Sequence, residues 1–347
     1  MDQLRTLSHS AVLTLIAGWV LHIGKDVLIP VVFGAIVIYV VIGLAEALKR
    51  IPYLHRILPL QLRYALSILL ISFFFFFILY LVISNRDSVL ALAPQYNESL
   101  LATIQKIATV LRIEKEPTGE TLRADLLGQI NIQRLLGSMV FSVSSMAVSI
   151  IIILLYAVFL MNESQSFEKK LARISNNQKV IARVKQVALN INRKVGAYLM
   201  LKTLISIFLG AVSWIIMVLI GLEFAAFWAV LIIFLNFIPY IGSALGVALP
   251  VVMAIVQFGD SSQVLWLALA LTMAQFFIGN FLDPFVMGNS LNLSPFAILV
   301  SLAIWAELWG IAGAFLAVPI TAVLAIILSE FSNTRAIAVL LSRDGQI

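Results

Sequence analysis

Two carboxylates lie within strongly apolar stretches of this sequence, Asp283 and Glu307. An ionised side chain is costly in an apolar environment, so such groups usually serve an ion or proton path. Each also has a structural interpretation. Asp283 precedes Pro284 and suits an Asp-Pro turn, whereas Glu307 suits a partner for a backbone amide or for an arginine of another subunit. Both carboxylates are therefore candidate coupling groups, with a structural role as the alternative.

Two amides stand near the same apolar stretches. Asn236 precedes the pair Pro239 and Tyr240, and Asn280 comes three residues before Asp283. From the end of an interrupted helix, an amide can coordinate a cation or a polar solute. It can equally hydrogen-bond a neighbouring helix. Both uses stay open for these two residues.

Other kinds of chemistry lack the residues they need. The sequence has no cysteine, and its three histidines have no companion ligands at metal spacing, so we expect neither a metal site nor thiol catalysis. Gly24-Lys25 lacks the glycine spacing of a phosphate-binding loop, so ATP is not the expected energy source. No serine–histidine or paired-aspartate constellation points to an enzyme. We therefore predict a non-enzymatic protein without cofactors. We interpret the three histidines as residues at the membrane interface; they are His9, His22 and His55.

The composition decides the environment of these residues. Of 347 residues, 62% are hydrophobic and 12% are charged, and the apolar residues come in long blocks. A bilayer core of about 30 Å requires roughly 20 apolar residues in a helix. The sequence therefore predicts an all-α polytopic membrane protein with about eight transmembrane segments, the first two forming a tight hairpin. The blocks are Leu7 to Ile23, Val27 to Leu48, Ala65 to Ser84, Phe141 to Met161, Thr203 to Leu222, Phe224 to Phe258, Val264 to Leu282 and Pro295 to Ser329.

Two of these blocks are too long for one straight span. About 35 residues at about 1.5 Å each would overshoot the hydrocarbon by about 20 Å. Proline lacks an N–H and glycine weakens a helix, and both occur inside these blocks. We therefore predict broken or re-entrant helical hairpins. The expected break residues are Asn236, Pro239, Tyr240 and Gly242 in the first block and Trp309, Gly310 and Gly313 in the second.

The two breaks also resemble each other in sequence. IGSALGVALPVVMAI follows the first break and WGIAGAFLAVPITAVLAI spans the second, and aligning them costs a shift of one residue. Each runs through glycine, small residues, a short apolar stretch and a proline, which is Pro319 in the second. Paired interrupted segments are typical of inverted-repeat transporters whose site lies at the repeat interface. The pattern therefore indicates a secondary transporter with its site at the breaks.

Loop charges predict the orientation in the membrane. Residues 49–63 hold four basic residues and no acid, and residues 169–202 hold nine basic residues, so both segments should be cytoplasmic. Residues 85–133 hold five basic and six acidic residues and should lie on the opposite face. Both termini should then be cytoplasmic. These loops account for the net charge of +6, so no nucleic-acid partner is expected.

The chain divides into six expected parts. Apolar residues at helical spacing predict a small helical extracytoplasmic domain in the outer segment. Apolar and basic residues on separate faces predict an interfacial helix in the cytoplasmic segment. The parts are N-terminal transmembrane helices at 1–84, the extracytoplasmic domain at 85–140, a transmembrane helix at 141–161, the basic amphipathic helix at 162–202, a C-terminal transport region at 203–330 and a cytoplasmic tail at 331–347.

Three motifs of the C-terminal half resemble the AI-2E family of bacterial and archaeal membrane proteins, named for autoinducer-2 export. They are NFIPYIGSALGVALP, GNFLDPFVMGNSLNLSP and LWGIAGAFLAVPI, in this order. The resemblance covers essentially the whole chain. It implies a bacterial inner-membrane protein of about eight spans, a homo-oligomer with a pentamer as the family expectation, and an elevator-like movement of a substrate-binding part.

Members of this family are associated with autoinducer-2 export or with Na+(Li+)/H+ antiport. The leading hypothesis is a secondary transporter that exports a small solute such as autoinducer-2, using an ion gradient or moving it downhill. The alternative is a Na+(Li+)/H+ antiporter. A hypothesis of another class is a non-transporting membrane scaffold, in which neutralising Asp283 and Glu307 would affect stability alone.

The expected partners are the lipid bilayer, the small-molecule or ion substrate and further copies of the chain. The residues expected along the substrate or ion pathway are Asn236, Pro239, Tyr240, Gly242, Asn280, Asp283, Pro284, Glu307, Gly310, Gly313 and Pro319.

Overall fold

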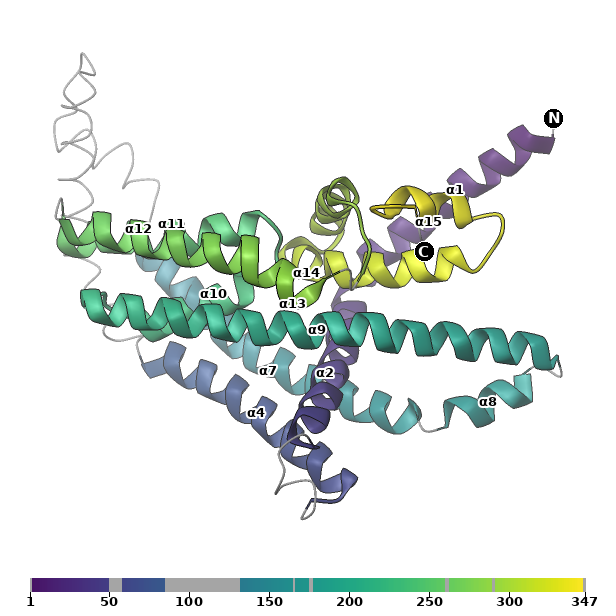
Figure 1. The fold of residues 1–347 in the computed structure, drawn as a ribbon, viewed down its shortest axis with the longest axis horizontal. Helices are drawn as coiled ribbons and strands as arrows, with labels where there is room; N and C mark the ends of the chain where they lie inside the picture. Colours follow the sequence, from purple (N-terminus) through teal and green to yellow (C-terminus); the bar gives the residue numbers. More distant parts are fainter. Residues whose placement is uncertain are drawn as a thin grey trace. The chain divides into compact units, whose positions relative to one another are not determined.

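The computed structural model describes residues 2–49, 58–84, 132–164, 166–174, 177–259, 262–288 and 291–345, and these residues are predominantly helical (Figure 1). The extended pairing in this part of the chain is one isolated bridge, between Leu293 and Ser342. The predicted all-α fold is confirmed for the described residues. The expected extracytoplasmic domain lies outside them over 85–131.

The described residues form the following helices. They are α1 (Asp2–Ile23), α2 (Lys25–Lys49), α4 (Leu60–Ser84), α7 (Ile132–Ser164), α8 (Phe167–Ile174), α9 (Gln178–Ile220), α10 (Ala225–Leu235), α11 (Ile241–Phe258), α12 (Ser262–Phe277), the π-helical η2 (Ile278–Leu282), α13 (Asp283–Met287), α14 (Pro295–Ser329) and α15 (Arg335–Leu341).

Six helical stretches in the described ranges are long and apolar enough to cross a membrane. They are Lys25–Lys49, Leu60–Phe77, Gln178–Ile220, Ile241–Phe258, Ser262–Met287 and Pro295–Ser329. Shorter apolar helices occupy Val12–Ile23, Val148–Ser164 and Ala225–Leu235. The polytopic helical architecture agrees with the sequence, while the number of about eight spans stays a prediction.

The helices belong to two compact units. One unit contains the described residues of the ranges 1–70, 151–203 and 287–347, and the other contains those of the ranges 71–150 and 204–286. Helices α4, α7, α9 and α13 contribute residues to both. The first overlong apolar block lies in the second of these units, and the second block lies in the first.

The predicted hairpin between the first two helices is wrong. Gly24 N–H donates to Val20 O at 2.8 Å, and Leu28 N–H donates to Gly24 O at 2.9 Å, which is the i to i−4 pattern of a continuing helix. Gly24 also lacks the positive φ that a tight reversal commonly uses. Helix α2 therefore continues α1 through a bend (Figure 1). The prediction of a cytoplasmic N-terminus assumed that these two helices cross the membrane separately, and the continuous course of α1 and α2 does not support that assumption.

Helix α9 is longer than the sequence suggested. It runs without interruption over 43 residues, which corresponds to about 65 Å and is roughly twice the hydrocarbon thickness. The expected basic helix and the span after it are thus one element. Lys202, counted above with the cytoplasmic basic residues, is only 8% exposed. The basic segment therefore reaches into the packed part of the molecule.

Candidate functional site

The first overlong block folds back on itself. Helix α10 ends at Leu235 and α11 begins at Ile241. A Cβ placed on Gly246 would lie 3.6 Å from Cγ1 of Ile232, although fourteen residues of straight helix would separate these positions by about 21 Å. The two helices are therefore the antiparallel arms of one hairpin, which we call the first hairpin.

The tip of the first hairpin has an irregular backbone. Tyr240 adopts φ 60° and ψ −59°, a conformation that is strained for a residue with a side chain. A Cβ on Gly242 would overlap the carbonyl oxygen of Leu235, so only glycine fits there. Pro239 brings no N–H to this turn, and its carbonyl accepts from Ile241 N–H at 2.6 Å. The residues predicted to break this block do form its turn.

Asn236 connects this tip to α9. Its amide Nδ2 donates to Ser206 Oγ at 2.9 Å, and Ser206 is fully buried. Asn236 also ends α10, with its own N–H bonded to Ile232 O. The structure thus shows the helix-bonding use of this amide, one of the two uses that the sequence left open.

The second overlong block, α14, also folds back. Gly310 interrupts the helix with φ 63° and ψ −140°. On either side of it, Trp305 Nε1 donates to Thr321 Oγ1 at 3.2 Å, although sixteen residues of straight helix would span about 24 Å. Residues 295–309 and 311–329 are therefore two arms of a second hairpin. The predicted fold-back of both long blocks is confirmed.

The two tips share their construction. A residue with positive φ precedes the second arm in each hairpin, Tyr240 in the first and Gly310 in the second. Two or three residues later comes a glycine packed on a carbonyl of the first arm: Gly242 on Leu235 O and Gly313 on Trp305 O. The spacing differs by one residue, as the alignment of the two sequence motifs requires. Each second arm then carries a buried proline, Pro250 in the first hairpin and Pro319 in the second.

Asn280 and Asp283 lie where α12 changes its winding. The π-helical segment η2 contains Asn280, whose Nδ2 donates to Phe276 O at 3.0 Å. The chain then continues as α13, with Asp283 at φ −54° and ψ −55° and Pro284 in its first turn. The Asp-Pro turn considered for Asp283 is therefore wrong, because the backbone stays helical through it. Single π-helical turns inside α-helices often mark functional sites.

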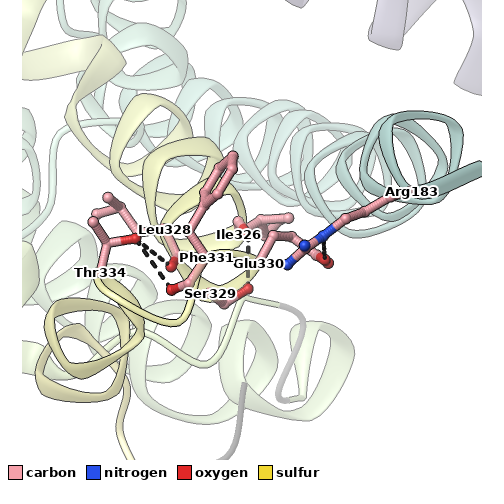
Figure 2. Close-up of polar contacts among 7 residues, drawn as sticks. All are labelled: Arg183, Ile326, Leu328, Ser329, Glu330, Phe331 and Thr334. Carbon is pink, nitrogen blue, oxygen red and sulfur yellow. Dashed lines mark hydrogen bonds and ion pairs between the residues drawn. The ribbon is translucent and has the colours of Figure 1, made fainter. Parts of the chain in front are cut away.

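The base of the second hairpin is held by the basic end of α9 (Figure 2). Arg183 Nε approaches Glu330 Oε2 at 3.5 Å, and its guanidinium carbon lies 5.5 Å from the ring centroid of Phe331. Thr334 Oγ1 donates to Leu328 O at 2.8 Å, which closes the turn after α14 (Figure 2). We call this contact of Arg183 with Glu330 and Phe331 the α9 clasp.

The C-terminal helix joins the two ends of the same hairpin. Ser294 caps α14, accepting from Ala297 N–H at 3.0 Å, with Pro295 in the first turn. After α15 the chain returns to this point, where Ser294 N–H donates to Leu341 O at 2.9 Å and Arg343 N–H donates to Asn292 O at 3.1 Å. The base of the second hairpin is therefore closed by its own tail.

The predicted site residues fall into two groups. The unit with the first hairpin holds Asn236, Pro239, Tyr240, Gly242, Asn280, Asp283 and Pro284. The other unit holds Glu307, Gly310, Gly313 and Pro319. Glu307 lies three residues before the break and is exposed. The structure thus brings the residues of each tip together within one hairpin, whereas Asn280, Asp283 and Pro284 lie on η2 and α13, outside both hairpins.

Comparison with known proteins identifies the family. Residues 10–333 match the sequence profile of the AI-2E family transporter. This chain belongs to the AI-2E family. With its membrane-spanning helices, it is a multi-pass membrane protein of a transporter family, and the resemblance seen in the three motifs is confirmed.

Individual AI-2E relatives align with different shares of the chain. The AI-2 transport protein TqsA of Escherichia coli K12 is 30% identical over 252 residues, 72% of this chain and 71% of that protein. A putative transport protein of Borreliella burgdorferi is 34% identical over 194 residues, 56% of this chain and 53% of that relative. A putative transport protein of Haemophilus influenzae is 25% identical over 339 residues, 96% of this chain and 95% of that relative.

The sequence did not predict one contact near the second tip of this AI-2E protein. His22, interpreted above as interfacial, places Nδ1 3.2 Å from Leu308 O, and Trp309 Nε1 donates to Leu21 O at 2.9 Å. The partners are 286 and 288 residues apart in the chain. No local pattern marks such a contact, because periodicity describes neighbours within a few turns.

Proposed function

We propose that this protein is a secondary transporter of the bacterial cytoplasmic membrane that exports a small solute such as autoinducer-2, using an ion gradient or moving it downhill. The observation that carries the proposal is the pair of similarly built broken hairpins. Membership of the AI-2E family and the similarity to TqsA, an AI-2 transport protein, support the substrate class.

The broken tips supply the physical reason for a site. Peptide groups freed by a break cannot remain unsatisfied in hydrocarbon, so they must face protein or a water-filled cavity. The second arm of each hairpin begins directly after the break, and a helix N-terminus presents N–H groups and a partial positive charge. Such ends hold polar groups of substrates in transporters with discontinuous helices. We assign this role to the tip around Pro239, Tyr240 and Gly242 and to the tip around Gly310 and Gly313.

Two carboxylates are proposed to sense the coupling ion. Asp283 follows the π-helical turn that contains Asn280, and Glu307 lies in the last turn before the second break. Each is placed beside irregular backbone in an apolar segment, where a charge is expensive unless it serves an ion or proton. If these carboxylates exchanged Na+ or Li+ for protons, the protein would be the Na+(Li+)/H+ antiporter of the alternative hypothesis.

The proposed orientation has a cytoplasmic C-terminus. The basic residues of α8 and of the first half of α9 favour the cytoplasmic face, and the α9 clasp places the base of the second hairpin beside that half of α9. Assembly into a homo-oligomer, with a pentamer as the family expectation, and an elevator-like movement are part of the same proposal.

The test is transport in proteoliposomes containing the purified wild type, Asp283→Asn or Glu307→Gln, with autoinducer-2, Na+ and Li+ offered in turn. We expect autoinducer-2 movement by the wild type and its loss, or loss of its dependence on an ion gradient, in the two variants. Glu163→Gln is the matched control, because Glu163 is an exposed carboxylate that pairs with Lys170 outside both hairpins. It should transport like the wild type.

Other outcomes identify the alternatives. Proton flux driven by Na+ or Li+ without autoinducer-2 movement, and lost in the variants, would establish antiport. No flux of any of these solutes by correctly folded wild type, with the two variants altered in stability alone, would establish the scaffold hypothesis.

A further inference from the structure

The tip of the second hairpin is bonded to the bend between α1 and α2 by two hydrogen bonds that run in opposite directions. Trp309 Nε1 donates to Leu21 O at 2.9 Å, and His22 Nδ1 lies 3.2 Å from Leu308 O. A carbonyl oxygen only accepts, so His22 Nδ1 must carry the proton in this contact. Each element therefore provides one donor and, on the preceding residue, one acceptor: His22 and Leu21 on one side, Trp309 and Leu308 on the other. We call this pair the α1 latch.

One bond serves a carbonyl at the break of α14, and the other serves a carbonyl at the bend between α1 and α2. The carbonyls of residues 306–309 would normally accept from N–H groups four residues later, but Gly310 leaves the helical conformation there. His22 supplies a donor to Leu308 O at this point. Leu21 O lies at the bend before α2 and receives the Trp309 indole. A carbonyl without a hydrogen-bond partner costs free energy where water is excluded, so the latch stabilises the break and the bend together.

The latch is continuous with the packed interior of the second hairpin. Trp309 is 6% exposed and Trp305 is 8% exposed, and their ring centroids lie 5.3 Å apart. Trp305 in turn donates to Thr321 on the second arm. A displacement of the α1 latch would therefore be transmitted through both tryptophans to the contact between the two arms.

The first hairpin differs at the corresponding place. Tyr240 is 56% exposed and Ile241 is 51% exposed. The described backbone hydrogen bonds of its turn come from within the turn itself, such as Gly242 N–H to Ile238 O at 3.0 Å. The two tips are built alike, yet only the second is described as bonded to a helix from the N-terminal part of the chain.

We propose that His22 is a positioning residue of the transport site: its hydrogen bond to Leu308 O holds the tip of the second hairpin in place. Trp309 holds the same tip through its hydrogen bond to Leu21 O. This inference rests on the proposed function, because it takes the second tip to be part of the site. It makes α1 a functional element of the transporter. It also has a chemical consequence: any side chain at position 22 that can donate to Leu308 O should replace histidine.

The experiment compares His22→Ala, His22→Gln and Trp309→Phe with the wild type. Glutamine keeps an N–H donor within reach, alanine removes it, and phenylalanine keeps the aromatic ring without the indole N–H. Trp19→Phe is the matched control, because Trp19 lies on α1 at 66% exposure. Amide hydrogen exchange of peptides covering residues 305–313 is measured without substrate, and autoinducer-2 transport is measured in proteoliposomes.

Loss of one such hydrogen bond should raise exchange at the tip about three- to tenfold in His22→Ala and Trp309→Phe, while His22→Gln and Trp19→Phe stay near the wild type. The KM for autoinducer-2 should rise in His22→Ala and return in His22→Gln. A purely structural role would lower the amount of active protein and leave the KM unchanged, and that result would overturn the proposal.

The exchange measurement is independent of the substrate. If wild-type protein does not move autoinducer-2, the proposed substrate is wrong, and the exchange of residues 305–313 alone decides whether His22 positions the tip. Wild-type exchange in His22→Ala, or failure of His22→Gln to restore protection, would show that it does not.

Discussion

Two glycines lie so close to a backbone carbonyl that no side chain fits. A Cβ at Gly242 would overlap Leu235 O, and a Cβ at Gly313 would overlap Trp305 O. Because the obstacle is backbone within the same hairpin, it cannot turn aside as a flexible side chain could. The close approach of the two arms therefore depends on the hydrogen atom at these positions.

Gly242→Ala and Gly313→Ala should each lower the free energy of unfolding by about 1–3 kcal/mol, the usual cost of overpacking, and should reduce transport. Gly18→Ala is the control, because a Cβ there meets nothing within 4 Å and alanine favours the helix. Thermal unfolding in detergent measures the difference. Equal melting temperatures for all three variants would mean that the arms do not approach each other as described.

At the level of elements, the second hairpin is held both at its tip and at its base. The α1 latch meets the tip, and the α9 clasp meets the base through Arg183, Glu330 and Phe331 (Figure 2). The side chain of Arg183 is 56% exposed and that of Glu330 is 27% exposed. A partly exposed ion pair of this kind contributes little by itself, so the stacking on Phe331 is expected to carry part of the contact.

A double-mutant cycle of Arg183→Ala and Glu330→Ala should give a coupling energy of about 0.2–1 kcal/mol at low salt, and less at high salt because the charges are screened. Phe331→Leu should weaken the contact further with little dependence on salt. The pair Glu46 and Lys49, at 3.9 Å within α2, is a matched cycle that joins no second element. Coupling of zero between Arg183 and Glu330 at low salt would mean that the clasp does not form.

At the level of the whole molecule, the clasp predicts which parts of the chain share one face of the membrane. Lys179 lies near the start of α9, four residues before Arg183, and Asn333 lies in the turn after α14; both are exposed. Since the clasp joins these two regions, they must face the same compartment. The basic composition of α9 makes that compartment the cytoplasm in our proposal.

The absence of native cysteine allows a direct test with single cysteines. Lys179→Cys and Asn333→Cys should both react with a membrane-impermeant maleimide in inside-out vesicles and stay unlabelled in intact cells. Labelling of the two positions from opposite sides would contradict the clasp. Labelling of both from outside the cell would contradict the proposed orientation and leave the clasp intact.

The sequence by itself determined the membrane environment, the helical class and the two places where long apolar blocks break. These properties follow from local causes. Pro239 lacks an N–H, and glycines such as Gly310 and Gly313 tolerate conformations that other residues do not. A straight helix of about 35 residues is longer than the hydrocarbon core of a bilayer is thick. The family could be predicted too, because its motifs are contiguous. For the same reason the candidate residues at both tips were found from sequence.

Only the tertiary structure decided what those breaks are bonded to. The bend at Gly24, the unbroken course of α9 past Lys202 and the helical backbone at Asp283 all differ from the expectation, because helix continuity depends on packing as well as on local propensity. His22 and Arg183 acquire their partners from residues more than a hundred positions away. Such contacts arise when the chain folds back on itself, and no spacing within a helix encodes them.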